Sequence, residues 1–314
     1  MYHSICIGFK CQVVISYCYN SKRSKYCISL YCPSFNSTIV LLFIMSFRKE
    51  KGLHMYTKNT LIKDIEQSGI RKTGTLLIHS SMKAIGEVEG GGDTVLDAFI
   101  EYMKEGLLLF PTHSWSDKNL QDGIYDPKTE PACVGILPNL FMKRADAIRS
   151  MHPTHSVTAI GSMAQAYVQR DSNVLRNGDV LTPCPRDGCF GGLYDEEAQL
   201  LFLGATLKTN TYIHSIEEWL NIPDRINPQS RKIKLLSEDG EANEIDLHGH
   251  YFSRGNVSKN YDKLLIPMLH MGIAKEVKIG DAVSYVVEVK PMTDWVIGLL
   301  KEDPSLFDDD QPIE

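Results

Sequence analysis

The sequence contains no hydrophobic run long enough to cross a membrane. The apolar stretch STIVLLFIM at residues 37–45 is nine residues long, whereas a spanning helix needs about 20. It also does not resemble a secretory signal, because it lies late, is followed by FRKEK and lacks a small-residue cleavage site. We therefore expect no membrane partner and no secretory signal.

Cysteine is scarce beyond residue 54. Five of the eight cysteines fall in residues 1–54, at spacings that match neither a zinc site nor a redox pair. The other three, Cys133, Cys184 and Cys189, are scattered along the chain. This distribution indicates a reducing, cytoplasmic setting for the body of the protein.

Acidic residues are nearly absent from residues 1–54. That segment has seven basic residues and one acid, Glu50, so its net charge is +6. The whole chain has 33 basic and 39 acidic residues, which leaves 26 and 38 in the body and a net charge of −12 there. An acidic body argues against a nucleic-acid partner, since phosphate binding needs a clustered basic face. The charge suits a cationic small molecule better.

The segment before residue 55 also lacks periodicity. Tyr, Cys and Ser are abundant there, and Met45 and Met55 offer later translation starts. We interpret residues 1–54 as a disordered or non-native N-terminal extension and residues 55–314 as the folded domain.

The body begins with a pattern of strand, helix and strand. The apolar runs in TLLIHSS and LLLFPTHSW predict two buried strands, each ending on polar residues. Between them lie a glycine-rich loop and an apolar helical pattern from Val95 to Met103, with Asp93 or Thr94 as the cap. This order predicts parallel pairing, which brings HSS and PTHSW to neighbouring carboxyl ends of one sheet.

The rest of the body mixes helical and strand patterns. Further buried strands are expected at QLLFLGA and at the end of RSMHPTHSVTAIG, and the segments RKIKLLS, GEANEIDLHGH and AVSYVVEV alternate like antiparallel strands. Further helices are expected at residues 57–70, 137–147, 211–221, 261–271 and 293–301. The expected fold class is α/β, with an antiparallel, strand-rich C-terminal part.

The glycine-rich segment HSSMKAIGEVEGGGDT has two interpretations. Backbone amides in such a loop, with Lys83 adding charge, can hold an anion such as a pyrophosphate. A surface loop that needs glycine only for its turns would look the same. The segment fits neither GxxxxGK[ST] nor GxGxxG, so phosphate binding does not follow from it alone.

Two segments, PTHSW (Pro111–Trp115) and HPTHS (His152–Ser156), combine histidine with hydroxyls at strand ends. Two histidines three residues apart could bind zinc, but no cysteine or carboxylate lies at a supporting spacing and HExxH is absent. Histidines bonded to backbone groups at turns are the favoured interpretation, and no metal is expected.

The segment NTYIHSIEE at residues 210–218 is expected to begin a helix that carries His214 in its first turns. Glu217 and Glu218 follow at three and four residues, which places them on the same helical face as the histidine. A carboxylate beside an imidazole raises its basicity and fixes its tautomer, as a general base near neutral pH requires. A solvated helix face gives the same pattern, and spacing alone favours that alternative.

The chain closely resembles the aminoglycoside 3-N-acetyltransferases through five segments in their order and spacing: HSSMKAIGEVEGG, LFPTHSW, RSMHPTHSVTAIG, LLFLGA and NTYIHSIEE. The resemblance runs from about Thr57 to near Thr293, and residues 1–54 have no counterpart in it. It implies an αβα layered fold around a central mixed sheet, and a catalytic domain that covers residues 55–314.

The resemblance also implies the reaction, which is transfer of an acetyl group from acetyl-CoA to the 3-amino group of an aminoglycoside, by a monomer or homodimer. By motif position, His214 would be the general base and Glu217 its partner carboxylate. The implied cofactor-binding residues lie at strand ends and in the glycine loop: Ser80, Ser81, Met82, Lys83, Gly86, Thr112 and Ser156. A substrate loop after PTHSW would bind the cationic amine through Asp117, Asp122 and Asp126.

This chemistry is consistent with the residue types. An amine is mostly protonated at pH 7 and must lose a proton before it attacks a thioester, so a histidine base is needed. The oxyanion needs donors, which backbone amides or hydroxyls at strand ends can supply. Since no covalent enzyme intermediate is required, the cysteines can all be incidental.

One segment departs from the family. Members that modify large aminoglycosides often have acidic residues in the late loop that contacts the drug, whereas here DLHGHYFSRGN has Asp246 as its only acid beside His248, His250 and Arg254. Fewer carboxylates attract a polycation less strongly, so the acceptor is expected to be narrower or a different amine. Two alternatives stay open, a CoA-binding protein without acetyl transfer and a histidine-based metal hydrolase.

The expected start near Met55 gives a direct test. Mass spectrometry of the untagged natural protein should find no peptide from residues 1–44, because those residues are interpreted as lying outside the natural product. Detection of such peptides would contradict this interpretation.

Overall fold

The computed structural model divides into two units, Met1–His54 and Met55–Glu314. The structure describes residues 3–6, 12–18, 25–32, 37–41, 55–116, 123–176, 181–236, 240–251, 253 and 255–313. In the first unit, four strands pair antiparallel in sequence order: β1 (His3–Cys6), β2 (Gln12–Cys18), β3 (Lys25–Cys32) and β4 (Ser37–Leu41). The sequence pattern did not indicate these strands, and the start near Met55 stays a prediction.

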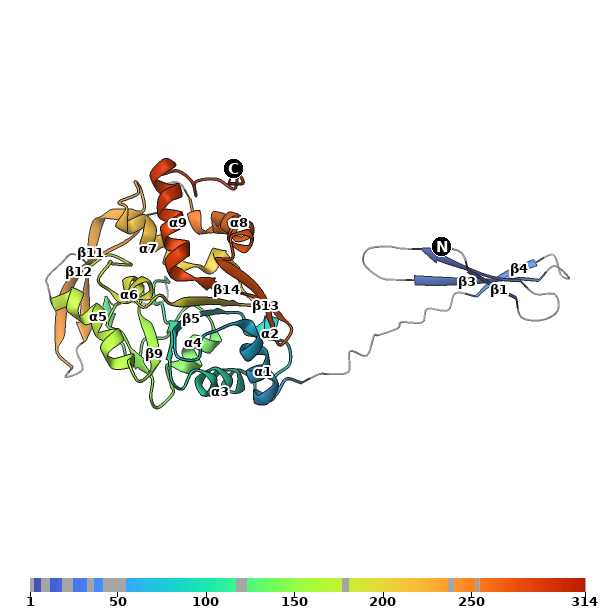
Figure 1. Ribbon diagram of the computed structural model, residues 1–314, viewed down its shortest axis with the longest axis horizontal. Coiled ribbons are helices and arrows are strands. Elements are labelled where there is room, and N and C mark those ends of the chain that lie inside the picture. The colour runs from blue at the N-terminus through green and yellow to red at the C-terminus, as the bar shows by residue number, and fades with distance from the viewer. Residues whose placement is uncertain are drawn as a thin grey trace. The chain divides into compact units, whose positions relative to one another are not determined.

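A seven-stranded mixed sheet forms the centre of the second unit (Figure 1). Its inner strands β10, β5 and β6 run parallel, and β14 and β9 pair antiparallel on either side of them. The parallel pairing of β5 with β6 confirms the expectation from the strand, helix and strand pattern. In spatial order the strands are β13 (Ala274–Ile279), β14 (Ala282–Glu288), β10 (Gln199–Leu203), β5 (Thr75–Ser80), β6 (Leu107–Pro111), β9 (Val157–Gly161) and β8 (Ile148–Arg149).

Helices cover both faces of this sheet, which confirms the αβα layered fold. Along β10, Leu200 and Phe202 pack into one buried cluster, whereas Leu201 and Leu203 pack into the other, because successive strand residues point to opposite faces. Figure 1 shows α1 and α3 on one side of the sheet and α6, α7 and α9 on the other. The helices are α1 (Lys58–Ser68), α2 (Met82–Ile85), α3 (Gly92–Tyr102), α4 (Ile136–Phe141), α5 (Ala164–Arg176), α6 (Cys189–Asp195), α7 (Thr211–Trp219), α8 (Leu265–His270) and α9 (Val289–Glu302).

The ends of α1 follow from its sequence. The Thr57 hydroxyl accepts a hydrogen bond from the Thr60 backbone N–H, and Thr60 reciprocates, which satisfies two donors at the start of the helix. Gly69 adopts φ +88°, a conformation that favours glycine, and ends the helix at Ser68.

A smaller sheet joins distant parts of the chain. Strand β11 (Ile226–Leu236) pairs antiparallel with β12 (Ala242–His250) and parallel with β7 (Ile124–Tyr125). The antiparallel C-terminal strands are therefore confirmed, although β14 lies in the central sheet and not beside β12. Strand β12 ends at His250, so this sheet positions His250 in the candidate active site.

Two expected helices need correction, and some helices were not expected. The helix expected at residues 137–147 ends at Phe141, where the chain turns and Arg144 forms ion pairs with Asp93 and Asp97 of α3. The helix expected at 261–271 is a 3-10 helix, Val257–Leu264, followed by α8, in which Pro267 lies in the first turn because it has no N–H to donate. Helices α2, α5 and α6 were not expected.

Within the described part of the chain, no helix has the length and apolar character needed to cross a membrane.

Because both faces of β10 are buried, truncation of one of its side chains should strongly lower the stability of the protein. Leu201 is 0% exposed, so Leu201→Ala should lower the free energy of unfolding by about 2–5 kcal/mol in chemical denaturation. Ile266 on α8 is 59% exposed, so Ile266→Ala should change it by less than about 0.5 kcal/mol. Equal losses in the two variants would contradict the layered core.

Candidate active site

The polar motifs converge at one edge of the central sheet. Since β5, β6 and β10 are parallel, their carboxyl ends lie together, and β9 begins at the same edge because it runs antiparallel to β6. His113 follows β6, and its Nε2 lies 3.1 Å from the hydroxyl of Thr211 at the start of α7. The Asn210 side chain caps this helix by accepting from the Tyr212 N–H. The PTHSW and NTYIHSIEE segments are thus in direct contact.

His214 and Glu217 form a hydrogen-bonded pair on α7. The His214 Nδ1 lies 3.0 Å from Glu217 Oε2, and the side-chain exposures are 12% and 0%. Glu218, expected beside His214, instead accepts from the Thr182 hydroxyl and, at 2.9 Å, from the Cys184 N–H. The two glutamates therefore have separate roles, and only Glu217 holds the histidine.

Three further residues complete a network around the Glu217 carboxylate. The Tyr261 hydroxyl lies 2.6 Å from Glu217 Oε2 and 2.7 Å from His214 Nδ1. The Arg225 Nε donates to Glu217 Oε1 at 2.6 Å, and another nitrogen of the same guanidinium donates to Asp308 at 2.9 Å. The sequence motifs gave no sign of these residues, because they come from a turn, a 3-10 helix and the C-terminal segment. Only the nearness of Arg225 to Glu217 in sequence could have suggested one of them.

The protonation states within the network follow from burial and charge. Burial raises the pKa of the Glu217 carboxyl, but the hydrogen bond and charge of His214, the charge of Arg225 and the Tyr261 hydroxyl outweigh burial and leave this pKa below its usual value. Burial, and then the charge of Glu217, hold the pKa of Tyr261 well above 10, so this side chain stays neutral. An ionised Glu217 is acceptor-only. In the neutral form of His214, the proton therefore lies on Nδ1, toward Glu217, and the lone pair lies on Nε2.

A group of buried histidines adjoins His214. The ring centroids of His214 and His250 are 4.5 Å apart, those of His250 and His155 are 4.9 Å apart, and those of His155 and His113 are 4.9 Å apart. Burial, reinforced by the neighbouring imidazoles, holds the pKa values of His113, His155 and His250 well below 6.5. These three rings are therefore neutral and polar at pH 7.

His152 serves as a turn residue, as the favoured interpretation of HPTHS expected. Its Nδ1 accepts from the backbone N–H groups of Thr154 and His155, and its Nε2 lies 2.8 Å from the Thr182 carbonyl. Within the described residues, no group of three or more His, Cys, Asp or Glu side chains is arranged to hold a metal ion.

The expected cofactor-binding residues fall into two groups. Ser80, Ser81 and Met82 are part-exposed and Lys83 is exposed at the carboxyl end of β5, and their contact with a cofactor stays a prediction. Gly86 has φ +93°, and a Cβ there would lie 2.7 Å from a carboxylate oxygen of Asp281, so the loop requires glycine.

Thr112 and Ser156 lie inside the protein. Both are 0% exposed, and their hydroxyls are 3.1 Å apart. The Arg149 guanidinium donates to the Ser156 hydroxyl at 3.0 Å and to the Thr112 carbonyl at 2.6 Å. Their hydroxyls are therefore engaged inside the protein, and their contact with a cofactor stays a prediction.

The expected substrate-binding aspartates are only partly described. Asp117 and Asp122 lie outside the described residues. Asp126 uses its two carboxylate oxygens in its own turn, where they accept from the Lys128 N–H at 2.9 Å and the Thr129 hydroxyl at 2.8 Å. Its role in amine binding stays a prediction.

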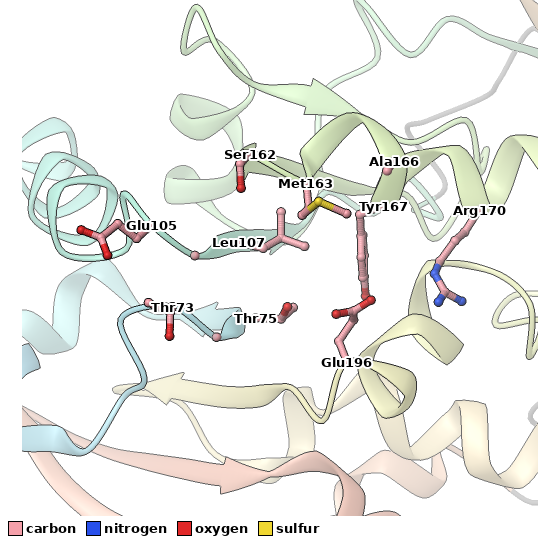
Figure 2. A pocket seen from close by; sticks show the side chains of 12 residues that line it. Thr73, Thr75, Glu105, Leu107, Ser162, Met163, Ala166, Tyr167, Arg170 and Glu196 are labelled. Carbon is pink, nitrogen blue, oxygen red and sulfur yellow. The ribbon is translucent and has the colours of Figure 1, made fainter.

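A pocket lies at the opposite edge of the sheet. Figure 2 shows it beside Thr75 and Leu107, at the amino ends of β5 and β6, with Glu105 and Glu196 on its walls. The motif residues described above gather at the carboxyl ends of the strands, so this pocket is separate from them.

The comparisons with known proteins agree with the architecture. The family model described as aminoglycoside 3-N-acetyltransferase matches residues 77–301. The chain belongs to this acyltransferase family. Similar curated proteins include aminoglycoside N(3)-acetyltransferase VII of Streptomyces paromomycinus, 25% identical over 78% of this chain and 92% of the relative, and aminoglycoside N(3)-acetyltransferase III of Serratia marcescens, 24% identical over 79% and 98%.

Solved structures of the family share the fold. The apoenzyme of aminoglycoside acetyltransferase AAC(3)-IVa matches with a TM-score of 0.68 at 21% identity, over 81% of this chain and 92% of that one. AAC-IIIb, solved as a binary complex with CoASH, matches with a TM-score of 0.68 at 18% identity, over 79% and 97%. A histidine-to-alanine variant of AAC(3)-IVa was solved with a gentamicin and, separately, with apramycin.

The buried position of Glu218 predicts a pH-dependent stability. Burial raises the pKa of the Glu218 carboxyl from 4.5 to about 7, even though Thr182 and Cys184 donate to it. Between these values the unfolded chain releases the proton while the folded protein keeps it, so rising pH favours unfolding. The free energy of unfolding of wild type should equal that of Glu218→Gln near pH 4. Near pH 7.5 it should be lower than that of the variant by on the order of 1–3 kcal/mol.

Chemical denaturation of both proteins across this pH range measures the difference. Glu276→Gln, at an exposed position of β13, is the matched control. A difference between wild type and Glu218→Gln that does not change with pH would contradict the raised pKa.

Proposed function

We propose that this chain transfers the acetyl group of acetyl-CoA directly to an amine of an aminoglycoside or a related cation, with His214 as the general base. The observation that carries the proposal is the pairing of a part-exposed imidazole with a fully buried, ionised carboxylate, 3.0 Å apart, on α7. A surface histidine on a solvated helix face would lack this buried partner, so the geometry favours the catalytic interpretation of NTYIHSIEE.

The His214 side chain can carry out the proton transfer that the reaction needs. Nε2 of His214 takes the ammonium proton of the amine, and the neutral nitrogen then bonds to the acetyl carbon. The bond from the acetyl carbon to sulfur breaks, the thiolate of CoA takes up the proton held by His214, and the excess proton left on the nitrogen is released to solvent. Glu217 accepts from Nδ1 throughout, so it holds the ring and stabilises the imidazolium that forms.

The carboxyl end of β5 is the proposed place of the thioester. The Ser80 and Ser81 hydroxyls are part-exposed there, and the Lys83 ammonium is exposed. Donors at a strand end can stabilise the oxyanion that develops on the carbonyl oxygen. The CoASH complex of a structural neighbour supports a CoA ligand for this fold.

The acceptor is proposed to be a cation, to whose binding β12 contributes few carboxylates. That strand contributes Asp246, which is exposed and accepts from Ser230 at 3.3 Å, and places the neutral ring of His250 beside the base. Attraction of the amine then depends on the overall acidic body and on the segment that contains Asp117 and Asp122. This composition favours a smaller or less charged acceptor than a large aminoglycoside.

The role of His214 can be tested by substitution. His214→Ala should lower acetyl transfer by roughly 10²- to 10⁴-fold, because loss of a general base costs about this much, while acetyl-CoA binding stays close to wild type. The measurements are CoA thiol release with gentamicin, apramycin and simpler amines, and calorimetry with CoA.

His270→Ala is the matched control, since His270 is an exposed residue on α8. Wild-type turnover in His214→Ala would rule out the assigned base. CoA binding by wild type with no thiol release for any amine would favour the alternative, a CoA-binding protein without acetyl transfer.

A further inference from the structure

The C-terminal segment that follows α9 lies beyond residues 77–301, which the family model matches. This segment, Asp303–Ile313, folds back over the 3-10 helix Val257–Leu264. The Asn260 side chain donates to the Phe307 carbonyl at 2.8 Å, and the Lys263 ammonium donates to the Leu306 carbonyl at 2.7 Å. The backbone of the segment is therefore fixed at two consecutive residues.

Phe307 inserts from this segment against Tyr261. Phe307 is 0% exposed, and its ring centroid lies 4.8 Å from that of Tyr261 with the ring planes at 77°. This edge-to-face contact restricts the Tyr261 ring, whose hydroxyl donates to Oε2 of Glu217. Phe307 thus reaches the carboxylate of the pair through one intervening side chain.

Asp308 is linked through Arg225 to the other oxygen of the Glu217 carboxylate. Its Oδ1 accepts from Arg225 at 2.9 Å, and the Arg225 Nε donates to Glu217 Oε1 at 2.6 Å. Arg225 is only 4% exposed, so its charge needs close carboxylate partners to offset the cost of burial. Asp308 holds one edge of the guanidinium while Glu217 holds another.

We propose that the C-terminal segment is a positioning element for the base, in which Phe307 and Asp308 act on Glu217, and through it on His214, by way of Tyr261 and Arg225. The proposal rests on the proposed function of His214. The two routes hold different oxygens of the carboxylate, so rotation of the Glu217 carboxylate would break both. Phe307 and Asp308 are positioning residues, since they act on His214 through Tyr261, Arg225 and Glu217.

The charge balance gives Asp308 a second effect. Arg225 alone would cancel the charge of Glu217, whereas Arg225 with both carboxylates leaves one net negative charge beside His214. That charge stabilises the imidazolium that forms when His214 takes the proton of the amine. Loss of Asp308 should therefore affect turnover more than substrate binding.

Asp308→Asn tests this in the full chain, because it keeps the shape of the side chain and removes its charge. It should lower kcat by ~10-fold with the KM for acetyl-CoA unchanged, since small displacements of a catalytic group cost about this much or more. Asp308→Glu should recover most of the rate. Asp310→Asn, the same change at an exposed position two residues on, should match wild type.

A spectroscopic measurement separates this proposal from the proposed function. In protein with ¹⁵N-labelled histidine, the Nδ1–H of His214 should give a signal protected from exchange by its bond to Glu217, assigned by its loss in His214→Gln. The signal should broaden in Asp308→Asn and Phe307→Ala but not in Asp310→Asn.

An unchanged signal and unchanged kcat in Asp308→Asn would overturn the positioning role, as would a rise in KM alone. If wild type transfers no acetyl group yet the signal responds to Asp308→Asn, the positioning role stands and the proposed function fails.

Discussion

The site depends on one buried charge, the carboxylate of Glu217. An ionised carboxylate taken out of water is costly unless donors surround it. Here the donors are the imidazole of His214, the hydroxyl of Tyr261 and the guanidinium of Arg225. Each donor also gains a fixed direction from the carboxylate. Because α7, the turn after it and the 3-10 helix all meet at this group, its burial both orients the histidine and joins three separate segments.

The central sheet explains why these segments meet. Helices cover both faces of the parallel strands β5, β6 and β10. The polar segments that follow these strands therefore lie together at the carboxyl ends of the strands. There His113 contacts Thr211 of α7, and His155 joins it from the start of β9. The short strands β7, β11 and β12 then add His250 from a second sheet. His214 thereby lies beside neutral rings, with Glu217 as its ionised partner.

The sequence predicted the parts of the fold that local patterns determine. The buried strands and the parallel β5–β6 unit could be inferred, because strand runs and glycine turns are local signals. Helical spacing placed both Glu217 and Glu218 beside His214, and only the family resemblance singled out Glu217. Helix α5 was missed, although its buried residues Ala164, Tyr167, Val168 and Asp171 recur at helical spacing, because polar residues dominate the segment. Tyr261 and Asp308 could not be inferred, since their contacts with Glu217 and Arg225 arise only when distant segments pack together.

The electrostatics of the network bear on the acceptor. With His214 neutral, Glu217, Asp308 and Arg225 together carry one net negative charge, and with His214 protonated the four groups are neutral. The network is therefore suited to take up one proton and offers little further attraction to a polycation. The nearby imidazoles add dipoles without charge, because burial lowers the pKa of His250 and His155 well below 6.5. Under the proposed function, selection among amines must then come from groups farther out than this network.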